Sequence, residues 1–245
     1  MRQVLDLLDK HTMWCSLGGS CALQASLKYC GYWTPPSPWC CSHTDTPDFF
    51  STVAIRELEE KFSGITPNTV EHAPYNGYPD VGQFLNYPEQ YDIHYFGGGS
   101  KDKTSMSLED YYQRFWDHRV SSWLQKLENP EITCINLCFN CTNELYLHEV
   151  PARNELNQLL LDHQLLFLDY LHERYPRRYK LLFLVEEHDD NLILPTTKRK
   201  DTLVLFCPKQ TVFWFDEGDP TGDNSLNYYH YLASRYTYYE QLRTL

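Results

Sequence analysis

The sequence lacks any apolar run long enough to cross a membrane. Its 245 residues contain no stretch of about 18 consecutive apolar side chains, which a transmembrane helix requires. Residues 1–10 mix acidic, basic and apolar side chains, and they lack the apolar centre of a signal peptide. We therefore expect a cytoplasmic protein with no membrane partner, and we expect its nine cysteines to be mostly reduced.

Basic residues are also scarce. Lys and Arg number 21 against 33 Asp and Glu, so the formal net charge is −12. Binding to a phosphate backbone depends on clustered Lys and Arg, so we expect no nucleic-acid partner. The densest basic runs, Arg177-Arg178 and Lys198-Arg199-Lys200, are short and typical of solvated turns or helix ends.

Internal repeats and low-complexity segments are absent, which favours a single domain over residues 1–245. Hydrophobic residues make up 42% of the chain, enough for a full core. Helical patterns concentrate in about 1–127 and strand patterns in about 128–245, an arrangement that indicates an α+β fold. We expect helices over 20–30, 49–62, 105–127, 153–174 and 224–245, and strands over 91–96, 132–139, 179–185, 202–206 and 211–215. The last two strands are expected to form a hairpin that turns at 207–210.

One short segment combines local geometry with nucleophilic chemistry. Gly18-Gly19 precedes Ser20, a good N-cap for the expected helix, and Cys21 would be its first residue. The positive end of a helix dipole favours thiolate over thiol, and a thiolate is the nucleophile of cysteine hydrolases. The alternative is that Cys21 is a small apolar residue at the start of a core helix, as free cysteine often is.

The stretch from residue 18 to residue 32 resembles a known family. Gly19-Ser20-Cys21 before an alanine-containing helix resembles the nucleophile segment of papain-like cysteine peptidases, and the sequence to Gly31 is similar to peptidase domains that trim bacteriocin leaders. The resemblance implies a papain-like α+β fold, with a helical N-terminal part packed on a mainly antiparallel C-terminal sheet. The chain departs from these families at Cys15, where they place an oxyanion-binding glutamine, so a backbone amide would have to serve instead.

The resemblance also implies a histidine and an orienting Asn or Asp on the later sheet. His188 follows the apolar strand and Asp216 ends the segment 212–215, so we assign His188 as general base and Asp216 as the residue that orients it. His148, in an alternating segment, is the rival base. The alternative for His188 is an exposed turn residue among acidic neighbours.

These assignments predict a thiol-dependent hydrolase or acyltransferase without cofactor or metal. It would act on a peptide, isopeptide or side-chain amide bond of a protein or peptide substrate, through Cys21, His188 and Asp216. Trp14, Trp33 and Trp39 are candidates for the walls of a substrate groove. The alternative is a non-catalytic binding protein, such as a viral or host-directed factor, that holds a protein partner with aromatic-rich loops like 33–41.

Two further patterns bear on metal binding. Cys134, Cys138 and Cys141 have the spacing of the iron–sulfur site in radical S-adenosylmethionine enzymes. Because Cys134 and Cys138 fall on one face of the expected strand, buried thiols are the alternative reading. His163 and His172 lie nine residues apart on one expected helix, about 180° around its axis, so they are not expected to share a metal.

Overall fold

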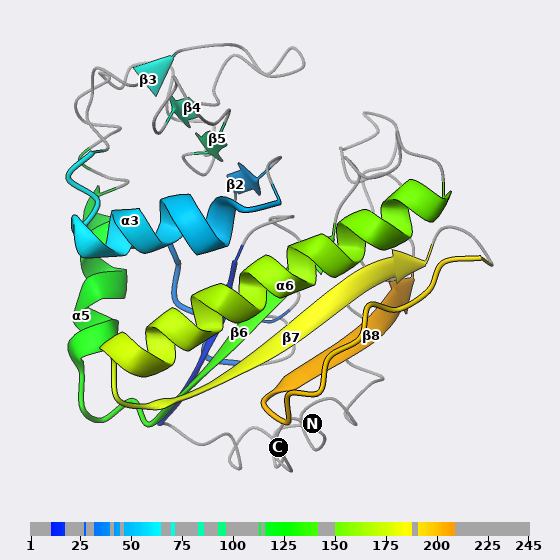
Figure 1. The fold of residues 1–245 in the computed structure, drawn as a ribbon. Helices are drawn as coiled ribbons and strands as arrows, with labels where there is room; N and C mark the ends of the chain where they lie inside the picture. The colour runs from blue at the N-terminus through cyan, green and yellow to red at the C-terminus, as the bar shows by residue number, and fades with distance from the viewer. Residues whose placement is uncertain are drawn as a thin grey trace, which may run out of the picture.

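A four-stranded sheet in which every strand is parallel to its neighbours lies at the centre of the fold (Figure 1). Its order is β1-β6-β7-β8, with β1 at Thr12–Ser16, β6 at Cys134–Cys141, β7 at Arg178–Glu187 and β8 at Thr202–Pro208. The structure is a computed structural model. It describes residues 11–17, 27, 32–39, 42–44, 47–64, 70–71, 83–85, 93–96, 113, 116–141, 150–187 and 191–208.

The parallel sheet shows that the expected papain-like fold with a mainly antiparallel sheet is wrong. Residues 1–127, expected to be helical, contribute β1 to this sheet. They also contain a second, antiparallel sheet in the order β2-β5-β4-β3. Its short strands are β2 at Ser42–Thr44, β3 at Val70–Glu71, β4 at Gln83–Leu85 and β5 at Ile93–Phe96.

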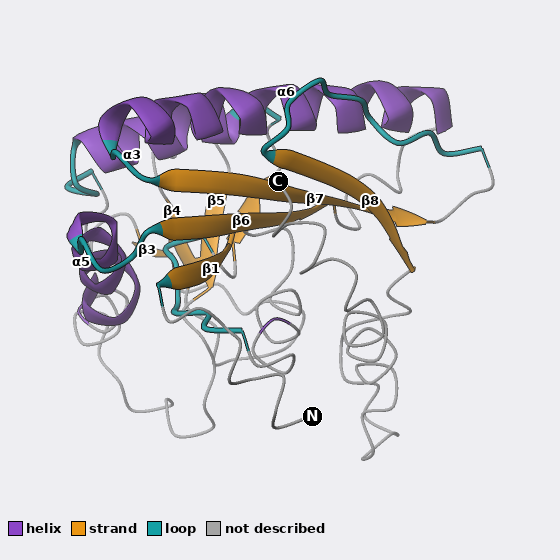
Figure 2. Ribbon diagram, turned by 90° about the horizontal axis from the view of Figure 1, so that it is seen from below, coloured by secondary structure: helices purple, strands orange, loops and turns teal. Residues whose placement is uncertain are grey.

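Parallel pairing requires the chain to cross back over the sheet between strands. Helix α6, Val150–Arg174, makes this crossover between β6 and β7 and covers one face of the sheet (Figure 2). The expected helix 153–174 is confirmed, and the expected strand 179–185 is the core of β7. β7 lies between β6 and β8, the central position that its apolar sequence predicts.

The crossover between β7 and β8 uses an extended segment in place of a helix. Residues 191–201 run alongside α6: Ile193 N–H donates to Asn154 Oδ1 at 3.0 Å, and His172 Nε2 lies 3.4 Å from Asp201 Oδ2. The helical path from 154 to 172 is about 27 Å long, and the extended path from 193 to 201 is about 26 Å long. Eight extended residues therefore return the chain as far as eighteen helical ones. The expected hairpin turn at 207–210 is wrong in its first half, because Cys207 and Pro208 pair with β7.

The remaining described helices are short and pack beside α6. A π-helical turn η1, Phe50–Ala54, leads into α3, Ile55–Glu59, and these two cover most of the expected helix 49–62. A second π-helical turn η3, Trp116–Ser121, leads into α5, Ser122–Glu128, within the expected helix 105–127. Figure 2 shows α3 and α6 on the same side of the parallel sheet.

Trp39 is the centre of an aromatic cluster between these elements. Its ring centroid lies within 5.9 Å of those of four other rings, and its side chain is fully buried. These rings belong to Phe50, Phe62, Trp123 and Phe167. Trp39 Nε1 donates a 2.9 Å hydrogen bond to Glu57 Oε2, so the polar edge of this buried indole is satisfied.

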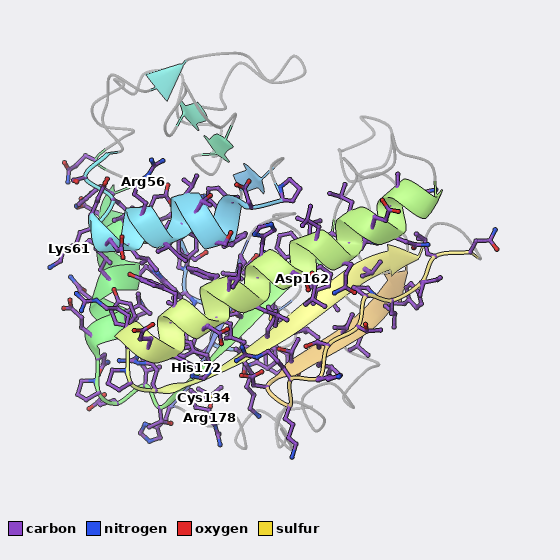
Figure 3. All side chains as sticks on the ribbon, viewed as in Figure 1. Arg56, Lys61, Cys134, Asp162, His172 and Arg178 are labelled. Carbon is purple, nitrogen blue, oxygen red and sulfur yellow. The ribbon has the colours of Figure 1, made fainter. Side chains whose placement is uncertain are left out.

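Helix α3 ends in a Schellman motif that uses no glycine. Phe62 N–H donates to Glu57 O at 2.6 Å and Lys61 N–H to Leu58 O at 3.2 Å, which are the two bonds of the motif. Lys61 stands at the C′ position with φ 50°, where a side chain with a Cβ atom is disfavoured. The position of Lys61 at the end of α3 can be followed in Figure 3.

We predict that Lys61→Gly raises the free energy of unfolding by about 1 kcal/mol, because glycine adopts positive φ without steric cost. Urea unfolding followed by tryptophan fluorescence measures the change. Lys61→Ala is the matched control and should give no gain, since alanine keeps the Cβ atom. A glycine variant less stable than the parent would contradict this account of the helix end.

Candidate functional site

The residues that the sequence predicts as catalytic lie outside the described residues. This holds for Cys21, His188 and Asp216, and also for the rival base His148. The described strands nevertheless fix where the chain enters and leaves these segments. β1 ends five residues before Cys21, and β7 ends at the residue before His188.

The ends of the parallel strands lie at one edge of the sheet, but they are staggered. Ser16, the last residue of β1, is level with Cys138 of β6. Cys138 is in turn level with Leu182 of β7, which continues for five more residues to Glu187. In open parallel sheets, ligands bind outside the carboxyl ends of the strands, so this edge is the candidate site.

The tryptophans expected to wall a groove occupy different environments. Trp14 is 2% exposed and stacks on Tyr32, with ring centroids 4.3 Å apart and planes 15° apart. Trp39 is fully buried in the aromatic cluster, whereas Trp33 is 44% exposed. Trp14 and Trp39 are therefore core residues, and of these three tryptophans only Trp33 is available for contact with another molecule.

The three cysteines with iron–sulfur spacing do not converge. They lie on one extended strand, where Cys134 and Cys138 point to one face and Cys141 to the other. Four residues along a strand separate Cys134 from Cys138 by about 13 Å, too far for one cluster. Burial raises the pKa of the Cys138 thiol well above its usual value, and proximity to Cys15 raises it further, so it remains protonated. Within the described part of the chain, no group of three or more His, Cys, Asp or Glu side chains is arranged to hold a metal ion.

His163 and His172 lie on opposite sides of α6, as the nine-residue spacing predicts. His163 Nδ1 and Ser51 Oγ of η1 are hydrogen bonded at 2.7 Å. His172 faces the other way, toward Asp201, and its ring packs edge-on against Tyr179 with centroids 5.3 Å apart. Figure 3 shows His172 near the amino end of β7.

An ion-pair network joins the extended crossover to α6. Arg199 donates to Asp201 through two nitrogens, at 2.9 and 2.7 Å, and its third nitrogen donates to Asp169 of α6. Burial acts to raise the pKa of Asp201, but hydrogen bonds from Arg199 and its positive charge outweigh burial and lower it. The sequence predicts that this basic run is a solvated turn or a helix end. An ion pair between Arg199 and Asp201 could be predicted from their spacing of two residues. The pair between Arg199 and Asp169 could not, because only the crossover brings these two residues together.

The other expected basic turn also has a structural role. Arg177 donates through its guanidinium to the carbonyl oxygens of Lys126, at 2.9 Å, and Leu127, both in the last turn of α5. The Lys126 carbonyl also accepts a hydrogen bond from Asn129 N–H at 3.3 Å, and a positive charge is favoured at a helix carboxyl end. Arg178, the next residue, is exposed.

Comparisons with models of protein families, with curated proteins and with solved structures found no match to this chain. None of the described helices is both long enough and apolar enough to span a membrane. The argument for function therefore rests on this chain's own residues.

We predict that Asp201→Asn lowers the free energy of unfolding at pH 7 by about 1 kcal/mol, because it removes the ion pair with Arg199. The loss is no larger because Asp201 is partly exposed and solvent partly screens the pair. The pKa of Asp201 is lower in the folded state than in the unfolded state. Its contribution to the free energy of unfolding is therefore fully present above the unfolded-state pKa and is lost as the pH falls through the folded-state pKa. Urea unfolding between pH 7 and pH 2 should show a smaller loss of stability on acidification in this variant.

Asp162→Asn is the matched control for this measurement. Asp162 is an exposed residue of α6 that accepts a hydrogen bond from Gln158 of the same helix (Figure 3). Equal acid dependence in both variants would contradict the role of Asp201 in fastening the crossover.

Proposed function

We propose that the protein is a thiol-dependent hydrolase or acyltransferase that acts on an amide bond of a protein or peptide substrate at the carboxyl edge of the parallel sheet. Cys21 is the nucleophile, His188 the general base and Asp216 the residue that orients the imidazole. The observation that carries this proposal is the common direction of β1 and β7, because Cys21 follows one strand and His188 the other.

Chain length supports a meeting of the two residues. β7 extends five residues beyond the level of Ser16, a rise of about 17 Å. The five residues from Ser16 to Cys21 span at most about 18 Å when extended, so they can climb to the level of Glu187. β1 and β7 are two strand positions apart, about 10 Å, a gap that side chains from both edges can close.

The segment after Cys21 supports an activated thiol. Leu27, the only described residue of this segment, is helical and 2% exposed. It lies within the expected helix 20–30, which begins near Cys21. A thiol at a helix amino end has a lowered pKa, and the helix amides there are available to bind an oxyanion.

The reaction needs only these groups and a substrate. The Cys21 thiolate attacks the amide carbon, and the imidazolium of His188 gives its proton to the departing amine. Water, or the amine of a second molecule, then gives a proton to His188 and attacks the thioester carbon, which releases Cys21 as thiolate. Hydrolysis and acyl transfer differ only in which of these acceptors attacks.

His148 is the second candidate base, because it lies between β6 and α6. β6 pairs directly with β1, so its carboxyl end is one strand position closer to the Cys21 segment than that of β7. Both histidines follow strands that end at the candidate edge. Substituting each histidine in turn distinguishes which of them is the general base.

We predict that, at pH 6, iodoacetamide alkylates the Cys21 thiol at least about tenfold faster than it alkylates the thiol of free glutathione. The reason is that a lowered pKa keeps Cys21 as the thiolate. Peptide mass spectrometry over a pH series gives the rate for every cysteine of the native chain. His188→Gln should shift the Cys21 profile to higher pH, and His148→Gln should leave it unchanged. The opposite pattern would assign the base to His148.

Cys138 is the internal control, because its buried thiol should react slowly at every pH until the protein unfolds. If Cys21 reacts no faster than glutathione in the native protein, the hydrolase proposal fails. The binding-protein alternative would then gain support from Trp33, whose exposed indole lies in the aromatic-rich loop.

A further inference from the structure

On the face of the parallel sheet turned away from α6, strand β6 is buried but polar, whereas β7 contributes the apolar Leu182 and Leu184 beside Lys180. On β6, Ile135, Leu137 and Phe139 belong to the apolar core, whereas the alternate residues are thiols and amides. These are Cys134, Asn136, Cys138 and Asn140, none more than 4% exposed. The central strands of a parallel sheet are normally apolar on both faces, and buried amides destabilise a fold unless they find partners. This face therefore has a composition that packing alone does not explain.

Lys180 of β7 lies on the same face and is only 3% exposed. It is in register with Asn136, which is in register with Trp14, so these three residues form one row across neighbouring strands. Lysine is almost never buried without a partner. Among the described residues, no carboxylate forms an ion pair or hydrogen bond with Lys180.

The surroundings of Lys180 favour its uncharged form. Burial lowers the pKa of its amine; Cys134 acts in the opposite direction with a smaller effect, and the positive charge of Arg178 lowers the pKa a little further. Figure 3 shows Cys134 and Arg178 close together near the amino ends of β6 and β7, where Cys134 and Arg178 are paired in register. An uncharged lysine amine is a nucleophile, whereas the ammonium form is not.

Asn136 supplies a hydrogen-bond donor beside this amine. Its Oδ1 accepts a hydrogen bond from Cys134 Sγ at 3.7 Å, which directs the amide oxygen toward that thiol. The amide N–H groups of Asn136 take no part in this bond, and the residue lies on the row shared with Lys180. A donor next to a nucleophile is suited to polarise a carbonyl oxygen and to stabilise the charge that develops on it.

We propose that Lys180 is a reactive amine that binds small aldehydes or ketones covalently as an imine on the polar face of the sheet, with Asn136 holding the carbonyl oxygen. The amine nitrogen attacks the carbonyl carbon to give a carbinolamine. Both hydrogens of the amine and the former carbonyl oxygen then leave as water, and a C=N bond joins Lys180 to the ligand. No oxidant or reductant is consumed.

This site is distinct from the carboxyl edge. Lys180 is the third residue of β7 and stands eight residues before His188, near the opposite end of the strand. The proposal does not depend on Cys21, so a Cys21→Ser variant should bind the carbonyl compound as the parent does.

Reductive trapping of the full chain tests the proposal. Glycolaldehyde with sodium cyanoborohydride converts any imine to a stable amine, which peptide mass spectrometry assigns to a residue. At pH 7 we expect Lys180 to be modified at least about tenfold faster than the exposed Lys61 and Lys198, because a larger fraction of its amine is uncharged. The rate at Lys180 should also reach a plateau below the pH range in which a lysine amine ordinarily loses its proton.

Asn136→Leu is the informative variant, because it is close to asparagine in size and removes the amide donor without adding a charge beside Lys180; it should slow trapping at Lys180 by about tenfold without affecting Lys61. Circular dichroism establishes whether the variant is folded, and the parent chain alone provides the decisive rate if it is not. Trapping of Lys180 at or below the rate of the exposed lysines would overturn the proposal. Modification of Lys180 only in urea would overturn it as well, since the amine would then be inaccessible in the native protein.

Discussion

Parallel pairing requires the chain to return to the amino edge of the sheet before each strand begins, and the rest of the structure depends on this constraint. The first return, between β1 and β6, spans residues 17–133 and includes α3 and α5. The second is α6, and the third is the extended segment 191–201 that runs along α6. Because α6 and this segment cover the same length of sheet, one element supports the other, and the Arg199 ion pairs fasten them together. The same constraint places the carboxyl ends of all four strands at one edge of the sheet, where the candidate thiol site is proposed.

The two faces of the sheet differ in composition. Toward α6, alternate strand residues join an apolar core centred on Trp39, whose buried indole is satisfied by Glu57. Toward the other face, β6 presents amides and thiols, and β7 places Lys180, which has no carboxylate partner among the described residues, beside the apolar Leu182 and Leu184. We interpret buried polar side chains that do not add to stability as residues with a role in binding or catalysis. The geometry thus separates two candidate sites, one at the carboxyl edge and one on the polar face.

Local elements could be predicted from the sequence, and the sheet could not. The apolar run 179–185 predicted a central strand, and the periodic segment 153–174 predicted a long helix, because both signals lie within the elements themselves. The order of strand 132–139, helix 153–174 and strand 179–185 is the pattern of a parallel crossover, but the resemblance around Cys21 directed the interpretation to an antiparallel sheet. β1 was missed altogether: Thr12–Ser16 is short, and its place in the sheet depends on pairing with β6, more than a hundred residues away.

By itself, the sequence determined which segments are apolar, where the long helix ends, and that His163 and His172 face opposite ways, since each depends on spacing within one segment. Only the tertiary structure decided that Trp39 is buried while Trp33 is exposed, that Cys134, Cys138 and Cys141 cannot converge, and that Arg199 is paired with Asp169. The physical reason is that burial and pairing are set by partners distant in sequence, and a side chain's own periodicity carries no information about which partner the fold brings to it.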